Sequence, residues 1–183
     1  GMSSDKPTGA DNQQETKVTT QQLDPSWIVG FVDGEGCFSV AIHSNPRNAR
    51  RTRGWQLTAT FQVSQHESER ALLERIRSRF GCGYVYHKGP NSSVATYSVT
   101  RLADLEERIL PFFDQHTLHV KDDDFQTFAT IVRSMRTKEH LRPDGFDRIV
   151  RLAYTMNAHG RQRARPIEDI LQGSSETVRQ APR

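Results

Sequence analysis

Two stretches in which apolar and polar residues alternate, with a basic segment between them, constrain the fold of this chain most strongly. The alternation runs over residues 38–43 and again over residues 55–64. A period of two residues is typical of strands that face a core on one side and solvent on the other. The segment between the two stretches has no acidic residue and carries Arg47, Arg50, Arg51 and Arg53. The sequence therefore predicts a long β-hairpin with a basic loop at its tip.

Local signals place the other elements around this hairpin. Asp24-Pro25 is a helix start, with an acid at the N-cap and proline at the first helical position, and this helix is expected to stop at Gly34 or Gly36. Residues 64–67 (Ser-Gln-His-Glu) have the spacing of a capping box, which predicts a helix from there to Phe80. Strands are also expected at 84–86 and 94–100, and helices at about 102–113, 122–137, from Pro143 and after Pro166, with Pro111 marking an end or a kink.

The order of these elements, helix–strand–strand twice and then helices, indicates an α+β domain. We expect a four-stranded antiparallel sheet with helices on one face and extra helices at the C-terminal end. A chain of 183 residues suits one domain, which we place at residues 23–171. Residues 1–22 and 172–183 are polar and are predicted to be disordered tails.

The second face of the predicted sheet carries hydroxyl and amide side chains and few acids. Such groups hydrogen-bond base edges in a DNA groove, and flanking arginines pair with phosphates. An ordinary solvent-facing sheet and a solvated basic loop are the alternatives. The candidate DNA contacts are Ser39, Ala41, His43, Asn45, Arg47, Arg50, Arg51, Arg53, Gln56, Thr58, Thr60, Gln62, Tyr84, Tyr86, Lys88, Thr96 and Ser98.

The remaining composition argues against several classes of protein. The net charge is +3, so the placement of the basic residues matters more than their total. The two cysteines give neither a disulfide framework nor the spacing of a zinc site. No apolar run of about 20 residues and no signal peptide is found. We therefore expect no membrane partner and a location inside the cell, in the cytoplasm or an organelle matrix, without secretion.

The segment 27–36 (Trp-Ile-Val-Gly-Phe-Val-Asp-Gly-Glu-Gly) places two glycines inside an apolar helix. Gly30 and Gly34 are about one turn apart and therefore share a face. Glycine inside a helix costs about 0.5–1 kcal/mol relative to alanine, which is reasonable where another backbone packs closely. That backbone could belong to the same helix of a second copy or to the chain's own sheet.

Asp33 and Glu35 are expected at the C-terminal end of this helix, where the macrodipole disfavours acids. Carboxylates beside free helix carbonyls provide the hard oxygen ligands that suit Mg²⁺. A single Glu35 would be a poor metal site, but two paired helices would bring two Glu35 side chains together. Two metal ions held there would suit the hydrolysis of a phosphodiester.

Residues 28–36 resemble the signature of the LAGLIDADG homing endonucleases. The similarity continues at 61–66, 80–84, 110–113 and 121–125, and it covers about residues 25–140. The resemblance implies an αββαββα domain, whose paired sheets form a saddle over double-stranded DNA. It further implies cleavage across the minor groove of a long, pseudo-palindromic site with 3′ overhangs, and Mg²⁺ as the metal, for which Mn²⁺ can substitute. One motif per chain implies a homodimer, with Ile28, Gly30, Phe31 and Gly34 at its interface.

The same resemblance assigns roles by position. Glu35 matches the metal-binding acid, and Gly34 offers a backbone carbonyl to the metal. Gln65 matches a polar residue that orders water, and Lys121 matches the basic residue that polarises the attacking water or stabilises phosphate charge. Glu35, Gln65 and Lys121 are thus the candidate catalytic residues, whereas Asp33 matches a position that shapes the helix end.

Several alternatives stay open. An RNA-binding maturase that helps a host intron to splice, or a DNA-binding protein without catalysis, would use the same scaffold. Gln65 also fits the first residue after a helix cap, and Lys121 fits a solvated lysine at a helix start. Some relatives carry a basic residue where this chain has Glu69, and Arg70 is a candidate substitute. The basic residues expected to contact phosphates near the C-terminus are Arg161, Arg163 and Arg165.

Overall fold

The hairpin predicted from the alternation organises the whole structure. This computed structural model describes residues 22–156 and 165–173. Strand β1 (Gly36–Ser44) pairs antiparallel with β2 (Trp55–His66), and the register is unbroken from Gly36 opposite Val63 to Ser44 opposite Trp55. The tip of the hairpin, predicted as a loop, is instead folded into two short helical turns, η1 (Pro46–Asn48) and α2 (Ala49–Thr52).

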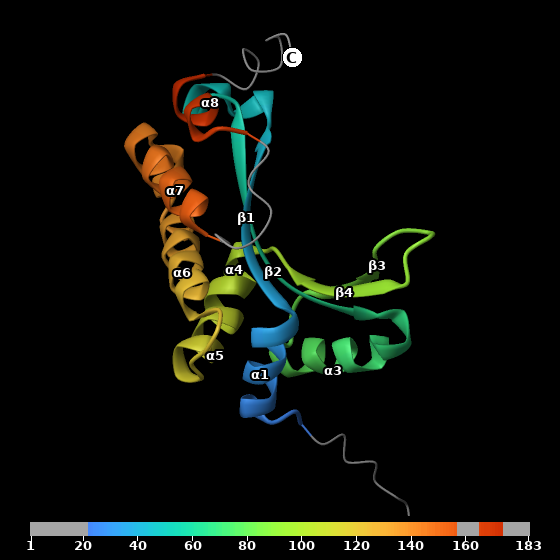
Figure 1. Cartoon of the computed structure of the whole chain (residues 1–183). Coiled ribbons are helices and arrows are strands. Elements are labelled where there is room, and N and C mark those ends of the chain that lie inside the picture. The colour runs from blue at the N-terminus through green and yellow to red at the C-terminus, as the bar shows by residue number, and fades with distance from the viewer. Residues whose placement is uncertain (1–21, 157–164, 174–183) are drawn as a thin grey trace, which may run out of the picture.

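The other two strands extend the sheet on the far side of β2. Strand β4 (Val94–Val99) pairs antiparallel with the second half of β2, and β3 (Tyr84–His87) pairs antiparallel with β4. The strand order is therefore β1-β2-β4-β3. In Figure 1, β1 and β2 run lengthwise through the molecule, whereas β3 and β4 run across it. The four-stranded antiparallel sheet expected from the sequence is confirmed.

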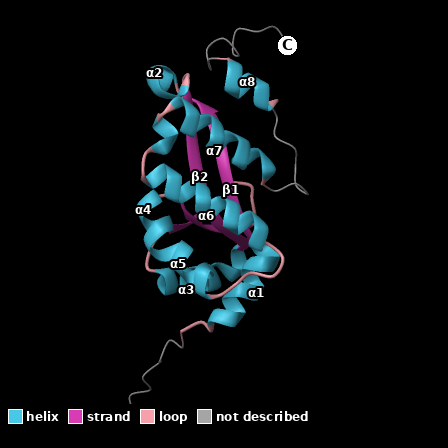
Figure 2. Cartoon of the chain, turned by 90° about the vertical axis from the view of Figure 1, so that its left-hand side faces the viewer, coloured by secondary structure: helices cyan, strands magenta, loops and turns pink. Residues whose placement is uncertain are grey.

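The helices lie on one side of this sheet, as the sequence predicts. Figure 2 shows α6 and α7 lying across the face of β1 and β2. The helical elements are α1 (Pro25–Glu35), η2 (Glu67–Glu69), α3 (Arg70–Phe80), α4 (Leu102–Asp104), the π-helical turn η3 (Leu105–Ile109), α5 (Leu110–Gln115), α6 (Asp122–Arg136), η4 (Glu139–Leu141), α7 (Pro143–Thr155) and α8 (Ile167–Gln172). No helix in this described part of the chain combines the length and the apolar character needed to cross a bilayer.

An aromatic cluster joins the sheet to the helices. The ring of Phe38 on β1 lies 5.1–5.6 Å, centroid to centroid, from the rings of Phe61, Phe113, Phe125 and Phe128. All five side chains are at most 1% exposed. Buried aromatic residues remove large apolar areas from water, so this cluster fixes α5 and α6 against the sheet.

Helix α1 begins and ends as the sequence predicts. The Asp24 carboxylate accepts the backbone N–H of Ser26 at 2.8 Å and lies before Pro25. At the other end the chain turns directly into β1 at Gly36. A Cβ on Gly36 would lie 2.6 Å from Cγ1 of Val32 and 2.8 Å from its carbonyl oxygen, so the turn requires glycine.

One local expectation was wrong, and a second was only partly right. The capping box at Ser64 does not form, because β2 continues to His66 and the Ser64 hydroxyl hydrogen-bonds the Thr96 hydroxyl of β4 at 2.8 Å. The cap is formed by His66, whose side chain accepts the backbone N–H of Ser68, and α3 begins at Arg70. Pro111 does not end its helix, because α4, η3 and α5 follow one another without a gap from Leu102 to Gln115. The helix is nevertheless irregular at this point, since the turn directly before Pro111, η3, is π-helical.

The last described segment returns to the hairpin. Ile170 of α8 is 1% exposed, and the Trp55 indole N–H donates to the carbonyl of Gly173 at 3.3 Å. The guanidinium of Arg165 lies over the Trp55 ring, 5.6 Å from its centre. Helix α8 ends at Gln172, one residue past the predicted domain boundary. Arg161, Arg163 and nearly all of the two predicted tails lie outside the described residues.

Candidate nucleic-acid interface and metal site

Polar side chains form rows across the face of the sheet that the helices leave uncovered. The register places Ser39 opposite Thr60, Ala41 opposite Thr58 and His43 opposite Gln56. Within these rows, a hydrogen bond of 2.9 Å joins His43 Nε2 to Thr58 Oγ1. Cross-strand contacts of this kind hold polar groups in a fixed array.

Asn45 makes one hydrogen bond to a side chain of the polar face and one to the backbone of the hairpin tip. Its Nδ2 donates to Gln56 Oε1 at 2.7 Å, and its side-chain oxygen accepts the backbone N–H of Arg47 at 3.2 Å. Asn45 therefore fixes the orientation of the Gln56 amide at the start of the basic tip.

Two of the predicted DNA contacts on β4 are covered. Thr96 and Ser98 are 1% and 2% exposed, so the expectation that they reach DNA was wrong. Each lies beside a tyrosine of β3, Thr96 beside Tyr86 and Ser98 beside Tyr84. The two tyrosine rings lie 5.6 Å apart and are among the exposed large side chains of the molecule. The two tyrosines, rather than Thr96 and Ser98, are therefore the exposed side chains on this half of the polar face.

The arginines of the hairpin tip separate into two groups. Arg47, Arg50 and Arg51 are exposed, and none has a carboxylate partner among the described residues. Arg53 instead pairs with Asp147 of α7, and its guanidinium lies 5.5 Å from the centre of the Phe146 ring. The prediction that Arg53 contacts DNA is therefore corrected, because this side chain ties the hairpin tip to α7.

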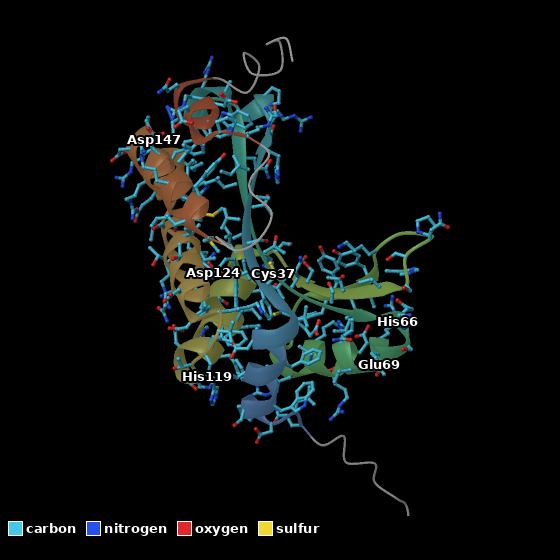
Figure 3. All side chains as sticks on the ribbon, in the orientation of Figure 1. Cys37, His66, Glu69, His119, Asp124 and Asp147 are labelled. Atoms are coloured by element: carbon cyan, nitrogen blue, oxygen red, sulfur yellow. The ribbon has the colours of Figure 1, made fainter. Side chains whose placement is uncertain are left out.

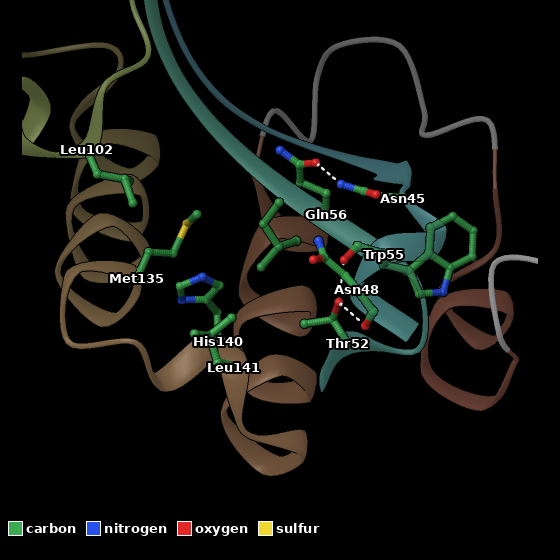
Figure 4. Close-up of a pocket in the computed structure, with 10 residues that line it drawn as sticks. Asn45, Asn48, Thr52, Trp55, Gln56, Leu102, Met135, His140 and Leu141 are labelled. Carbon is green, nitrogen blue, oxygen red and sulfur yellow. Dashed lines mark hydrogen bonds between the residues drawn. The ribbon is translucent and has the colours of Figure 1, made fainter. Parts of the chain in front are cut away.

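A pocket of about 360 Å³ lies between the hairpin tip and the helices behind it. Figure 4 shows Asn45 and Gln56, with their hydrogen bond, on one side of this pocket, and Met135 and His140 on the other. Trp55 also lines it. Beside this pocket, Arg53 ties the hairpin tip to α7, and Trp55 ties the start of β2 to Gly173 after α8.

The C-terminal end of α1 is held by the loop that precedes α6. The Asp33 carboxylate accepts the backbone N–H groups of His119, Val120 and Lys121 at 2.8, 3.0 and 3.1 Å. Burial acts to raise the pKa of Asp33, but these three N–H groups outweigh it, so the pKa lies below its ordinary value. Asp33 therefore shapes the helix end, as its motif position implied.

Lys121 lies at the same end of α1. Its ammonium group donates to the carbonyl oxygen of Asp33 and reaches that of Gly34 at 3.5 Å. A cation there complements the negative end of the helix macrodipole. The alternative of a lysine free in solvent is excluded, because the side chain caps α1 directly beside Glu35.

Glu35 is exposed at the tip of α1, and a Cβ built on Gly34 meets nothing within 4 Å. The described residues contain no group of three or more His, Cys, Asp or Glu side chains placed to hold a metal. One chain thus offers a single free carboxylate and nearby helix carbonyls. This donor set fits Mg²⁺, which is commonly bound by one or two carboxylates together with substrate phosphates.

Gln65 lies in β2 rather than at a helix start. It is two residues beyond Val63, the partner of Gly36, and therefore about 7 Å further along the strand. Its neighbour on β4 is Ala95, and strand alternation places it on the helix side of the sheet, half-buried. The structure brings Gln65 to the same end of the sheet as Glu35. The interpretation of Gln65 as the first residue after a helix cap was wrong.

Comparison with known proteins assigns the chain to a family. The family described as "LAGLIDADG endonuclease" matches residues 28–132. The chain belongs to this family. It is 30% identical over 142 residues to the Neurospora crassa protein named "Probable intron-encoded endonuclease 3", an alignment that covers 78% of this chain and 26% of that protein. The chain spans about a quarter of the length of the first curated relatives it matches.

Solved LAGLIDADG structures share the fold. The homing endonuclease I-TnaI aligns with a TM-score of 0.67 and 33% identity, covering 76% of this chain and 91% of that one. I-SmaMI, bound to an uncleaved DNA target in the presence of calcium ions, aligns with a TM-score of 0.73 and 31% identity, covering 84% of this chain and 50% of that one. The αββαββα arrangement expected from the resemblance is confirmed.

The outer face of the LAGLIDADG helix α1 differs from the predicted one by a single position. Ile28 is fully buried in the core of the chain, so its assignment to a dimer interface was wrong. The exposed positions include Trp27, Gly30 and Gly34, and Trp27 stacks on Phe31 at 4.8 Å between ring centres. Trp27 is 41% exposed and was missed, although its spacing from Gly30 and Phe31 places all three on one face.

Two further residues near the helix tip were missed. Val120 is 77% exposed and lies in the loop that Asp33 holds, next to Lys121. Figure 3 shows Cys37, just past the helix tip, close to Asp124 of α6. Burial raises the pKa of the Cys37 thiol, so the group stays neutral near pH 7. Arg70, the candidate substitute for a basic residue at position 69, pairs with Glu67 at 2.5 Å.

Proposed function

We propose that this chain is one subunit of a homodimeric, Mg²⁺-dependent endonuclease that cuts both strands of DNA at a long, pseudo-palindromic site and leaves 3′ overhangs. The observation that carries the proposal is the position of Lys121. Its ammonium group caps the carbonyls of Asp33 and Gly34 directly beside the exposed Glu35. A fixed cation and a free carboxylate at one helix tip suit the handling of a phosphodiester.

In this proposal, Glu35 and the Gly34 carbonyl hold the metal ion, together with phosphate oxygens of the substrate. When bound, Mg²⁺ supplies a Lewis acid that stabilises charge developing on phosphate oxygens. Lys121 stabilises negative charge on the phosphate or polarises the attacking water. Gln65 orders water at the same end of the sheet. Asp33 positions Lys121 through the backbone of the loop that contains it.

The DNA lies, in this proposal, along the polar face of the sheet. His43, Gln56 and Thr58 are placed to contact base edges, and Tyr84 and Tyr86 border the other half of the face. Arg47, Arg50 and Arg51 at the hairpin tip, together with the exposed Lys88 between β3 and β4, contact phosphates. The rows of the sheet thereby fix which side chains read neighbouring bases.

The homodimer is supported by the outer face of α1. Gly30 and Gly34 leave open space there, and the stacked pair of Trp27 and Phe31 borders it. The alignment covers 50% of I-SmaMI, so two units of this size fill a chain of that length. Pairing two α1 helices would place two Glu35 side chains near one axis. Each half-site of the target would then mirror the other.

The decisive experiment compares Glu35→Gln with the wild type and with Glu168→Gln, a matched change at an exposed position on α8. We expect Glu35→Gln to abolish cleavage of a selected DNA site while duplex binding persists, and Glu168→Gln to cut normally. Cleavage by Glu35→Gln at the wild-type rate would refute the role of Glu35.

A plasmid library supplies the substrate for this test and separates the rival functions. Incubation with Mg²⁺ is expected to produce cuts at one selected sequence, and replacement of Mg²⁺ by Ca²⁺ is expected to leave binding without cutting. Mn²⁺ should restore cutting. Tight binding of intron RNA with no cut in any metal would favour a maturase instead.

A further inference from the structure

A second cavity lies on the helix side of the molecule, away from the polar face of the sheet. It has a volume of about 320 Å³ and opens between the C-terminal end of α3 and the segment η3–α5. Figure 2 shows α3 and α5 at the same end of the molecule. Phe80 forms part of its wall and packs inward against the rings of Phe61 and Tyr97, which belong to the helix-facing side of the sheet. A ligand here would therefore be separated from DNA on the opposite face.

Two arginines give this cavity its charge. The guanidinium of Arg79 lies over the Phe112 ring, 5.3 Å from its centre, and its Nε is buried without a hydrogen-bond acceptor among the described residues. Arg108 makes one long contact, from Nη1 to the Phe80 carbonyl at 3.4 Å. Neither arginine has a carboxylate partner in the described part of the chain. Both guanidinium groups therefore retain donors for an anion.

The one acid in the cavity wall, Glu107, pairs with an arginine of α6. Glu107 accepts Nη2 of Arg136 at 3.3 Å, which offsets its charge. The remaining polar lining comes from Gln115 and from His116, whose ring lies 4.8 Å from that of Phe112. The lining thus combines two fixed cations with an amide donor and an imidazole, on an aromatic base.

We propose that this cavity is a phosphate-binding site for a nucleotide. Planar guanidinium groups match the oxygen geometry of phosphate, and two of them, from α3 and from η3, line this one cavity and favour a group with several oxygens. The volume suits a ligand of nucleotide size rather than a large cofactor. The phosphate comes either from a free mononucleotide or from the backbone of a single-stranded nucleic acid. The duplex bound on the polar face is not its source.

The test titrates full-length protein with inorganic phosphate, with AMP and with a short single-stranded RNA, using calorimetry at low salt. Arg79→Met keeps the packing on Phe112 and removes the charge, and Arg108→Gln removes the second cation. Arg151→Gln, an exposed change on α7, is the matched control. Binding of a duplex target to every variant checks that the fold and the polar face are intact.

We expect AMP or RNA to bind the wild type and the control equally, and to bind each cavity variant about tenfold more weakly or worse. If AMP saturates the site and RNA does not bind, the ligand is a free nucleotide. If RNA binds and inorganic phosphate displaces it, the ligand is a single-stranded nucleic acid. The proposal is overturned if none of the three probes binds, or if binding is unchanged in both cavity variants. These outcomes do not depend on DNA cleavage.

Discussion

Asp33 and Lys121 are joined by two reciprocal hydrogen bonds, each between the side chain of one residue and the backbone of the other. The Asp33 carboxylate accepts the backbone N–H of Lys121 at 3.1 Å, and the Lys121 ammonium returns to the backbone carbonyl of Asp33. These contacts join α1 to the start of α6 across 88 positions of sequence. The proposed catalytic lysine is therefore positioned by the motif that supplies the proposed metal-binding acid.

Replacing Asp33 by Asn is expected to weaken the contact between α1 and the loop that precedes α6. The amide cannot offer two charged oxygens to three N–H groups, so we expect the free energy of unfolding to fall by about 1–3 kcal/mol. Hydrogen exchange at the backbone of residues 119–121 should accelerate more than exchange in β2. Asp144→Asn, a change in the first turn of α7, is the control. Unchanged exchange in the 119–121 loop would contradict the anchoring role.

The same variant should abolish part of the acid sensitivity of the fold. Because the folded pKa of Asp33 lies below its unfolded value of 3.8, its contribution to stability is present above that value. The contribution is lost as the pH falls through the lower, folded pKa. Melting temperatures of wild type and Asp33→Asn should therefore differ at neutral pH and converge in strong acid. A constant difference across that range would be the contrary result.

Gly30→Leu separates folding from dimer formation. A side chain at Gly30 meets nothing within 4 Å inside the subunit, and leucine favours the helix more than glycine does. We expect a subunit at least as stable as the wild type that sediments as a monomer and no longer cuts DNA. Gln126→Leu adds a leucine to an exposed face of α6 and should leave the dimer intact. A dimeric Gly30→Leu would disprove pairing through this face.

The two groups of arginines at the hairpin tip should respond differently to mutation. Removing Arg50 and Arg51 together is expected to weaken binding to all duplexes. It should also reduce the slope of log affinity against log salt by about 2 for each subunit, and so by about 4 for the proposed dimer. Arg53→Gln should instead lower the free energy of unfolding by about 1 kcal/mol, because it breaks the pair with Asp147 and the contact with Phe146. Equal salt slopes for wild type and the double variant would exclude the phosphate contacts.

Helix α8 offers a test of how the hairpin tip is supported. Ile170 is 1% exposed, so Ile170→Ala should cost about 2–5 kcal/mol if the cavity it leaves does not collapse. Fluorescence of Trp55, which donates to Gly173, should change before the global unfolding transition. Ile167→Ala, at a half-buried position on the same helix, is expected to cost less.

The sequence was sufficient to predict those elements whose local pattern matches the surroundings they have in the folded structure. The alternation in β1 and β2 predicted the hairpin because one face of each strand meets the core. Asp24-Pro25 predicted the start of α1, since a cap and a fixed proline dihedral act within one turn. The family resemblance also implied that Glu35 and Lys121 belong to one site and that Asp33 shapes the helix end.

The wrong expectations arose where a partner distant in sequence decided the outcome. The capping signal at Ser64 lost to pairing with β4, because a continued strand satisfies backbone groups over several residues. Ile28 was assigned to the dimer interface together with Phe31, yet the core of the chain buries Ile28 and leaves Trp27 exposed. Arg53 and Thr96 could not be placed from sequence, since Asp147 and Tyr86 determine their surroundings.

Strand β2 belongs to two ladders that overlap over a short distance. It pairs with β1 as far as Val63 and with β4 from Phe61 onward, so Phe61, Gln62 and Val63 carry both. A rotation of the backbone there would swing the arginine tip relative to the paired tyrosines, while each ladder kept its own hydrogen bonds. If the polar face binds a duplex as proposed, the twist of these three residues sets the spacing between its two contacted ends, and this short span is where the length of the recognised sequence could be altered.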